Sequence, residues 1–344
     1  MINMVANTSG IIALAILSVS AFILSMLLTP LYTYFAYRFK FWKRKRETAT
    51  TGEKLTVFAK QQAEKLERNI PTMAGIIFLV AVTIITFFFN LDRRETWLPL
   101  VAFVGGGIVG LIDDVINVFG NGKGVAGLRS SIKFALIFAM GAILGWYFFA
   151  KLGYHAIHVP YLGMIELGWL VIPVFAFIVV ATGNAVNISD GLDGLAGGLA
   201  TIAYTAFGTI ATIQGQLHIA VFCFVMVGAL LAYLWFNIYP ARFFMGDVGS
   251  FAIGTSLGVV CMLTDTMFIL PIIGVIFVVE AGSSLIQIFS KKVFKRKIFI
   301  SAPIHHHIQA LGWPEVKITM RFWVIGAISA LIGILVAVTG TVGQ

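Results

Sequence analysis

Five aspartates of this 344-residue chain stand in short polar segments between long apolar runs. The segments are GLIDDVINVFG, GNAVNISDGLDGLAGG and FFMGDVGS, and the residues are Asp113, Asp114, Asp190, Asp193 and Asp247. Carboxylates gathered on one face of a protein repel one another unless a cation joins them. Mg²⁺ is usually held by one or two carboxylates together with substrate phosphates. The segments therefore predict a site for a phosphorylated substrate with Mg²⁺ as the cofactor.

Glycines and amide side chains accompany the aspartates. Tight turns and close approach of the backbone to a large anion are favoured by Gly191, Gly194, Gly246 and Gly249. Neutral donors and acceptors suited to a sugar or a base are Asn184, Asn187 and Asn237. Phe243 and Phe244 offer a ring for stacking, although phenylalanines of a membrane protein also serve as core or lipid contacts.

Three of the six histidines are consecutive, His305, His306 and His307 in SAPIHHHIQALGWPE. One interpretation is a solvated loop that is rich in histidine. In an extended segment side chains alternate, so His305 and His307 would face one way and His306 the other. One metal could not bind all three, and the chain shows no zinc-ligand spacing. We expect the imidazoles to hydrogen-bond or orient phosphate oxygens.

The elements that position these residues are predicted to be transmembrane helices. The chain is 59% hydrophobic and 11% charged, which leaves too little polar surface for a soluble fold of this length. Apolar runs of helical spanning length are expected near 10–36, 71–90, 98–116, 131–150, 168–186, 194–214, 217–238, 249–264, 268–289 and 322–342. We expect an all-α polytopic membrane protein with about ten transmembrane helices and a single domain over residues 1–344.

The basic residues predict the orientation, because lysines and arginines are retained on the cytoplasmic side. Of the 24 basic residues, 21 fall in segments that ten crossings place on one side. Both termini are then outside, and all five aspartates and the histidines face the cytoplasm in one cleft. The net charge of +9 is explained by anionic membrane lipids and requires no nucleic acid.

Several motifs together resemble the bacterial phospho-N-acetylmuramoyl-pentapeptide transferases. They are PTMAG, the aspartate pair, NAVNISDGLDGLAGG, NIYPARFFMGDVGS, VVEAGSSLIQ and APIHHHIQALGWPE, in the family's order between Pro71 and Glu315. The resemblance implies transfer of phospho-N-acetylmuramoyl-pentapeptide from its uridine diphosphate carrier to undecaprenyl phosphate. The products would be uridine monophosphate and the first lipid-linked peptidoglycan precursor, at the bacterial inner membrane.

The resemblance also implies residue roles. Asp247 would hold magnesium, with Asn187 as a further expected ligand, and one of Asp113 and Asp114 would be the base acting on the lipid phosphate. The histidine triplet would complete the catalytic cleft. Substrate contacts are expected from Thr72, Asn184, Asn187, Asp190, Asp193, Asn237, Phe244 and Gln287. Glu280 matches a family glutamate of the ninth helix.

The sequence departs from the family pattern at two cations. Glu67 and Asn117 stand where the family usually has lysines, Ala74 interrupts a glycine pair, and Gln309 replaces a glutamate. A pyrophosphate site should recover the lost charge from neighbours, and Arg68 is the best candidate because a guanidinium can hold two phosphate oxygens. Lys123 and Arg129 are further candidates.

Three alternatives stay open at this point. A related transferase could load N-acetylglucosamine phosphate onto the same lipid. A transporter would also bury acids, but near the bilayer midplane on broken helices. A catalytically inactive membrane scaffold is compatible with the lost lysines, and a homodimer is left open.

Overall fold

The computed structural model describes residues 2–42, 69–92, 96–120 and 127–340. The helices along the chain are α1 (Ile2–Arg38), α3 (Gly75–Phe89), α4 (Trp97–Phe119), α5 (Ser130–Ala150), α6 (Val171–Ser189), α7 (Leu195–Ile213), α8 (Leu217–Asn237), α9 (Gly246–Leu263), α10 (Leu270–Ile273), α11 (Val275–Val293), α12 (Ile304–Ala310) and α13 (Glu315–Thr339). A short 3₁₀ helix, η1 (Gly168–Leu170), precedes α6.

Eight of the described helices are long and apolar enough to cross a membrane. They are α1, α4, α5, α6 with η1, α7, α8, α9 and α13. The prediction of a polytopic all-α membrane protein is therefore confirmed, whereas the expected count of ten is not. The run at 71–90 forms only the 15-residue α3, and the run at 268–289 is interrupted at Gly274, between α10 and α11.

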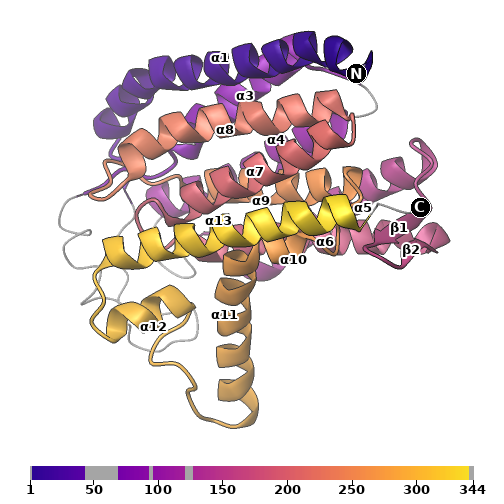
Figure 1. The fold of residues 1–344 in the computed structure, drawn as a ribbon. Helices are drawn as coiled ribbons and strands as arrows, with labels where there is room; N and C mark the ends of the chain where they lie inside the picture. Colours follow the sequence, from indigo (N-terminus) through magenta and orange to yellow (C-terminus); the bar gives the residue numbers. More distant parts are fainter. Residues whose placement is uncertain (1, 43–68, 93–95, 121–126, 341–344) are drawn as a thin grey trace.

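Helix α9 lies at the centre of the bundle, and α1 lies at its edge. In the apolar stretch of α9, 94% of the residues are buried, compared with 11% in α1. Helices α4, α6 and α3 pack on α9, while α1 packs mainly on α8 (Figure 1). Glycines allow this close packing: a Cβ on Gly254 would lie 2.6 Å from the Thr182 carbonyl oxygen of α6.

Two short antiparallel strands, β1 (Ala156–Val159) and β2 (Gly163–Glu166), form a hairpin that the sequence did not predict. Four residues per strand are too few for a clear alternation of apolar and polar residues. Asp265 accepts a hydrogen bond of 2.9 Å from the His158 backbone, and Tyr161 bonds to Thr339 at the end of α13. Burial raises the pKa of the Asp265 carboxyl, and the His158 bond partly offsets this. We call this end of the bundle the hairpin end.

Helix α11 differs from its neighbours in direction. Figure 1 shows α11 projecting from the bundle and crossing the direction of α13, with α12 returning toward the start of α13. The end of the bundle that carries α12, opposite the hairpin end, is called the acidic end. Helix α1 begins at the hairpin end, and α13 ends there (Figure 1).

Candidate active site

Three of the predicted aspartates meet where α4 packs on the first turn of α9. Asp113 and Asp114 lie in the last two turns of α4, and Asp247 lies in the first turn of α9. A Cβ on Gly110 would collide with the carbonyl oxygen of Asp247. Glycine at position 110 therefore allows the two helices to approach closely enough to bring the three carboxylates together.

Asp113 is buried and is held by three donors. Its Oδ1 accepts a hydrogen bond of 2.6 Å from the Leu128 backbone, and its Oδ2 accepts one of 2.8 Å from Asn117 Nδ2. Lys133 Nζ lies 3.4 Å from Asp113 Oδ1. These three donors fix the position of the carboxylate. Asn117, where the resemblance predicts a lysine, thus supports Asp113 by a neutral hydrogen bond one helical turn away.

Lys133 is a residue of the candidate site that sequence reasoning missed. Its Nζ lies 3.1 Å from Asp247 Oδ2 as well as 3.4 Å from Asp113, so one ammonium bridges the two helices. Lys133 thus supplies a cation at the aspartates, whereas Arg129, a candidate from the sequence, is exposed at the start of α5. A lysine in the first turn of a predicted span was the available signal.

Asp114 is fully buried and faces the turn before α9. Its Oδ2 accepts a hydrogen bond of 3.0 Å from the Val248 backbone. Gly246 has φ 71°, and a Cβ there would collide with Asp114 and lie 2.9 Å from Thr72 Oγ1. Thr72 Oγ1 is buried without a hydrogen bond to any described residue. Asp114 therefore fixes the Met-Gly-Asp turn, beside an unused hydroxyl of Thr72.

Asn187 lies against the same turn of α9 from α6. Its Nδ2 donates a hydrogen bond of 2.9 Å to Ser250 Oγ, which in turn donates to the Gly246 carbonyl. The amide oxygen of Asn187 is thus the atom that could ligate a metal near Asp247. Asn184 lies one turn earlier, and its Nδ2 donates a hydrogen bond to the Val180 carbonyl within α6.

The oxygen atoms of these side chains suit a magnesium ion that takes only a few of its ligands from the protein. Among the described residues no group of three His, Cys, Asp or Glu side chains is arranged to hold a metal. Nevertheless, Lys133 demonstrates that one cation can contact both Asp113 and Asp247. Two carboxylates and an amide oxygen are what Mg²⁺ takes when phosphates and water supply its other ligands.

The side chains of Asp193 and Asn237 form hydrogen bonds that connect two loops. Both side chains are buried: Asp193 Oδ2 accepts from the Ala241 backbone at 2.9 Å, and Asn237 joins the Gly194 N–H at 3.0 Å to the Phe243 carbonyl at 2.9 Å. The Asp193 backbone also bonds to Glu315 and Thr319 of α13. Asp190, partly exposed at the end of α6, lies in the same connection.

Phe243 and Phe244 have different environments. Phe243 is buried against Tyr32, with ring centroids 5.5 Å apart, and is a core residue. Phe244 is partly exposed, and its backbone bonds to Pro71 and Ala74, which ties the PTMAG segment to the turn before α9. Phe244 is therefore the ring of the two that remains accessible for stacking.

The three histidines lie in a helix, so the prediction of an extended segment is wrong. Helix α12 begins at Ile304 after Pro303, and successive side chains of a helix turn by about 100°. The signal was present: Ile304, Ile308 and Leu311 have helical spacing, and the two isoleucines pack on the core. The imidazoles consequently have three different sets of partners.

His305 connects three elements. Its Nδ1 lies 2.7 Å from Glu280 Oε2 of α11, and both side chains are completely buried. A Cβ on Gly191 would collide with His305 Nε2, so the α6–α7 connection lies directly against this ring. His305 therefore holds α12 between α11 and the segment that contains Asp190 and Asp193.

Of the other two histidines, His306 is also buried. His306 Nδ1 donates a 2.9 Å hydrogen bond to Gln309 Oε1, one turn later in α12. His307 is partly exposed, and its Nδ1 accepts a 3.2 Å hydrogen bond from the Ile300 backbone. In a neutral imidazole the other nitrogen then carries the proton. His307 Nε2 is thus available as a hydrogen-bond donor.

Gln287 supports the loop between α11 and α12. Its Oε1 accepts hydrogen bonds of 3.0 Å from both Ile298 and Phe299, and its Nε2 donates to the Phe299 carbonyl at 2.9 Å. These bonds occupy most of the amide's capacity. Gln287 therefore shapes the segment between α11 and α12, and its expected substrate contact is not visible in this arrangement.

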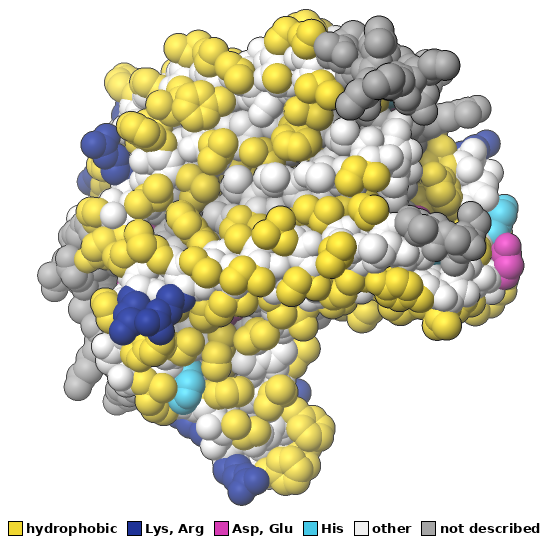
Figure 2. All heavy atoms as spheres, viewed as in Figure 1, with side chains coloured by type: hydrophobic (Ala, Val, Ile, Leu, Met, Phe, Trp, Pro, Cys, Tyr) yellow, Lys and Arg dark blue, Asp and Glu magenta, His cyan; other side chains and the backbone are white. Residues whose placement is uncertain are grey.

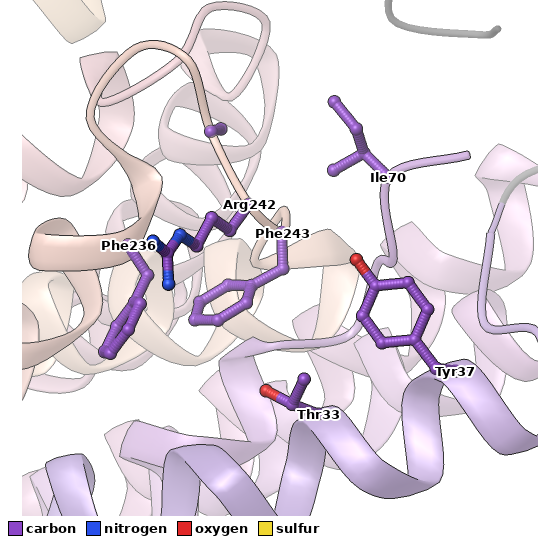
Figure 3. A pocket seen from close by; sticks show the side chains of 7 residues that line it. Thr33, Tyr37, Ile70, Phe236, Arg242 and Phe243 are labelled. Carbon is purple, nitrogen blue, oxygen red and sulfur yellow. The ribbon is translucent and has the colours of Figure 1, made fainter. Parts of the chain in front are cut away.

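A cavity of about 370 Å³ lies beside the candidate site, between α1 and the segment before α9. Figure 3 shows Thr33 and Tyr37 of α1 on one side, with Phe243, Arg242 and Phe236 on the other. Ile70 and Ala241 complete its lining. Its walls are formed by neighbours of Phe244 and of the PTMAG segment, and Phe243, one of the two rings considered for stacking, is among them.

Three residues that bear on the charge of the expected pyrophosphate site lie outside the described ranges. These are Glu67, Arg68 and Lys123. The expected role of Arg68 therefore stays a prediction, and Lys133 is the cation that the described part of the chain provides.

The chain is similar to known proteins over the region that contains this site. Residues 96–265, which include the three aspartates and Lys133, match the model of glycosyl transferase family 4. The phospho-N-acetylmuramoyl-pentapeptide-transferase of Chloroflexus aurantiacus is 36% identical over 336 residues, covering 94% of this chain and 89% of that protein. That of Geobacillus kaustophilus is 37% identical, covering 95% and 98%, and that of Listeria welshimeri is 36% identical, covering 92% and 96%. Since this likeness extends over nearly the full length of each relative, the chain belongs to the phospho-N-acetylmuramoyl-pentapeptide-transferase family.

Proposed function

We propose that this chain transfers phospho-N-acetylmuramoyl-pentapeptide from uridine diphosphate to undecaprenyl phosphate. This proposal rests on the group of Asp113, Asp114 and Asp247. Lys133 lies between Asp113 and Asp247. Residues 1–344 would act as one transmembrane transferase unit. A group of acids and one cation at the end of a bundle is suited to two phosphorylated reactants, one soluble and one held in lipid.

The reaction requires one bond to form and one to break. An oxygen of the lipid phosphate attacks the phosphorus that carries the sugar, and the bond from that phosphorus to the uridine monophosphate oxygen breaks. No covalent intermediate on the protein is needed. Asp113 is the better candidate for the base, because Asn117, Leu128 and Lys133 hold its carboxylate in place. Asp114 is a positioning residue, since its Oδ2 is bonded to the Val248 backbone.

Magnesium would be held by Asp247, with the amide oxygen of Asn187 nearby. When bound, the ion would offset the charge of the diphosphate and stabilise the leaving uridine monophosphate. Lys133 would contribute a second positive charge, which the protein provides whether or not the ion is present. These charges compensate for the lysines that Glu67 and Asn117 replace.

The nucleotide would bind beside Phe244, where Asp193 and Asn237 keep the surrounding loops in place. Stacking on an exposed ring suits any base, while the fixed loops supply backbone donors and acceptors. Thr72 Oγ1 is a further donor toward the phosphates, since no described residue uses it. His307 would donate to a substrate oxygen from α12.

We further propose that the acidic end faces the cytoplasm of the bacterial inner membrane and that both termini lie outside. Of the 24 basic residues, 21 fall in segments that ten crossings would place on one side, and this distribution supports the orientation. The two substrates would then reach the site from water and from the bilayer, respectively. A homodimer remains compatible with this arrangement.

The sugar specificity can be tested with membranes that contain the chain and undecaprenyl phosphate. We expect uridine monophosphate release with the N-acetylmuramoyl-pentapeptide nucleotide and none above background with the N-acetylglucosamine nucleotide. The reverse preference would assign the chain to the related N-acetylglucosamine phosphate transferases. Activity with neither, in folded protein, would indicate an inactive member of the family.

A further inference from the structure

The end of α11 carries a cluster of cations that the proposed reaction does not use. We name Lys292, Lys295, Arg296 and Lys297 the basic tip, and all four are exposed. Among the described residues none of the four pairs with a carboxylate. The sequence has no aspartate or glutamate between residues 281 and 314. Four like charges within six positions repel one another, so the basic tip is suited to an anionic partner.

Large apolar side chains share this surface with the cations. Val293, Phe294 and Ile298 are each more than half exposed, and Ile300 is 48% exposed. The Arg296 guanidinium lies 6.0 Å from the Phe294 ring. Apolar side chains interleaved with lysine and arginine are typical of surfaces that lie in the headgroup layer of a membrane.

The basic tip is a folded surface. Gln287 makes three hydrogen bonds to Ile298 and Phe299, and Ser290 Oγ donates a 2.9 Å bond to the Arg296 carbonyl. Phe294 N–H donates to the Ser290 carbonyl, and Lys295 has φ 54°, the left-handed conformation that ends many helices. These bonds hold the four cations together despite their repulsion.

The position of α11 favours lipid as the partner. Helix α11 projects from the bundle (Figure 1), and its shaft exposes Leu285, Ile286 and Phe289. Figure 2 shows hydrophobic side chains along the projecting part and basic side chains at its extremity. A helix with an apolar shaft and a basic end is expected to lie among acyl chains with its end at the headgroups. A soluble acidic partner would leave the interleaved apolar side chains in water.

We propose that the basic tip binds the anionic headgroups of bilayer phospholipids and thereby holds α11 and α12 in place. Glu280 of α11 is bonded to His305 of α12, so movement of the α11 shaft would displace the histidines. The four cations of the basic tip are not among the residues proposed for the transfer reaction. The partner of this surface is the bilayer itself, which distinguishes it from a site for the lipid phosphate substrate.

Lipid proximity can be measured without any activity. A fluorophore on Ser301→Cys would report on the basic tip, since the chain's own Cys223 and Cys261 are buried. The full chain is placed in phosphatidylcholine vesicles with a small fraction of spin-labelled phosphatidylglycerol or spin-labelled phosphatidylcholine, without polyprenyl phosphate. Each basic residue near a membrane surface enriches an anionic lipid by roughly fivefold. We expect spin-labelled phosphatidylglycerol to quench at least ~5-fold more strongly.

Two variants separate the basic tip from other cations. Lys292→Gln with Lys295→Gln, Arg296→Gln and Lys297→Gln should reduce the quenching ratio to about one. A matched control neutralises four exposed cations elsewhere, Arg38, Lys40, Lys317 and Arg321, and should keep the ratio. Replacing Lys292, Lys295 and Lys297 with arginine should keep it as well, because the charge is retained.

Three results would overturn the proposal. They are equal quenching by the two lipids in the parent chain, an unchanged ratio in the fourfold glutamine variant, and a preference that appears only when polyprenyl phosphate is added. The last would assign the cations to the substrate. Since none of these measurements requires turnover, failure of the proposed transfer reaction would leave their outcome unaffected.

Discussion

At the scale of residues, the site balances its charge differently from the pattern expected of its family. Asn117, where the resemblance predicts a lysine, bonds to Asp113, while Lys133 supplies the cation between Asp113 and Asp247. The aspartates were predictable from the sequence because acids are rare beside membrane spans and must have a purpose. Lys133 was not, because its proximity to Asp247 depends on how α5 packs beside α4, which the local sequence does not encode.

Replacing Lys133 tests this balance. Lys133→Met should lower the turnover of the transfer by about 100-fold, because a charge directed at the developing transition state is lost. Lys133→Arg should retain a larger share of activity, and Arg129→Gln, an exposed cation four residues earlier, should behave as the parent chain does. The initial rate of uridine monophosphate release measures all three. Equal rates for Lys133→Met and Arg129→Gln would remove Lys133 from the site.

The aspartates are expected to differ in their effects. Asp247→Asn should abolish transfer, since it removes the anionic oxygen expected to hold magnesium while keeping the side-chain shape. Asp113→Asn and Asp114→Asn should each cost at least ~100-fold. Asp114→Asn should also lower the thermal stability, because the buried carboxylate supports the turn before α9. Magnesium-dependent activity of Asp247→Asn within tenfold of the parent would reject its assignment.

At the scale of elements, the helical conformation of α12 directs the three imidazoles toward different surroundings. His305 is buried with Glu280, whereas His307 is partly exposed with one ring nitrogen available. The expectation of functional histidines came from their number and from the family motif, but their directions depended on helix formation. The helical spacing of Ile304, Ile308 and Leu311 indicates a helix in this segment, although the two flanking prolines suggest a loop.

The histidines should therefore separate stability from catalysis. His305→Ala would leave Glu280 buried without its partner and should cost about 3 kcal/mol of folding stability. His307→Ala should leave the melting temperature unchanged and reduce turnover by roughly 100-fold if its donor contacts substrate. Thermal unfolding in detergent and the transfer rate, measured on both variants, check this. A melting temperature of His305→Ala equal to that of the parent would contradict the structural role of the pair.

The contact between α4 and α9 can be tested with matched glycine variants. Gly110→Ala should destabilise the protein by about 1–3 kcal/mol and impair transfer, because its Cβ would push α4 away from Asp247. Gly282→Ala in α11 is the control, since a Cβ there meets nothing within 4 Å. Its stability should match or slightly exceed that of the parent. Equal behaviour of the two variants would show that the helices are not closely packed at the site.

At the scale of the whole molecule, composition was sufficient to predict a polytopic helical membrane protein. The apolar runs correctly located the eight spanning helices, since spanning helices require about 20 apolar residues. Run length alone could not reveal that α11 leaves the bundle. Its polar residues, among them Glu280 and Gln287, bond to α12 and the following loop instead of to the bundle's other helices. That departure carries the basic tip away from the bundle, while α12 with the histidines returns toward the start of α13 (Figure 1).

The central claim is most directly tested by one stoichiometric measurement on purified chain in a bilayer. With the N-acetylmuramoyl-pentapeptide nucleotide, undecaprenyl phosphate and magnesium, the lipid-linked product and uridine monophosphate should form in equal amounts. Neither should form with Asp247→Asn. Release of uridine monophosphate without a lipid-linked product, or no turnover by folded parent chain, would contradict the assignment of this site as a phosphosugar transferase.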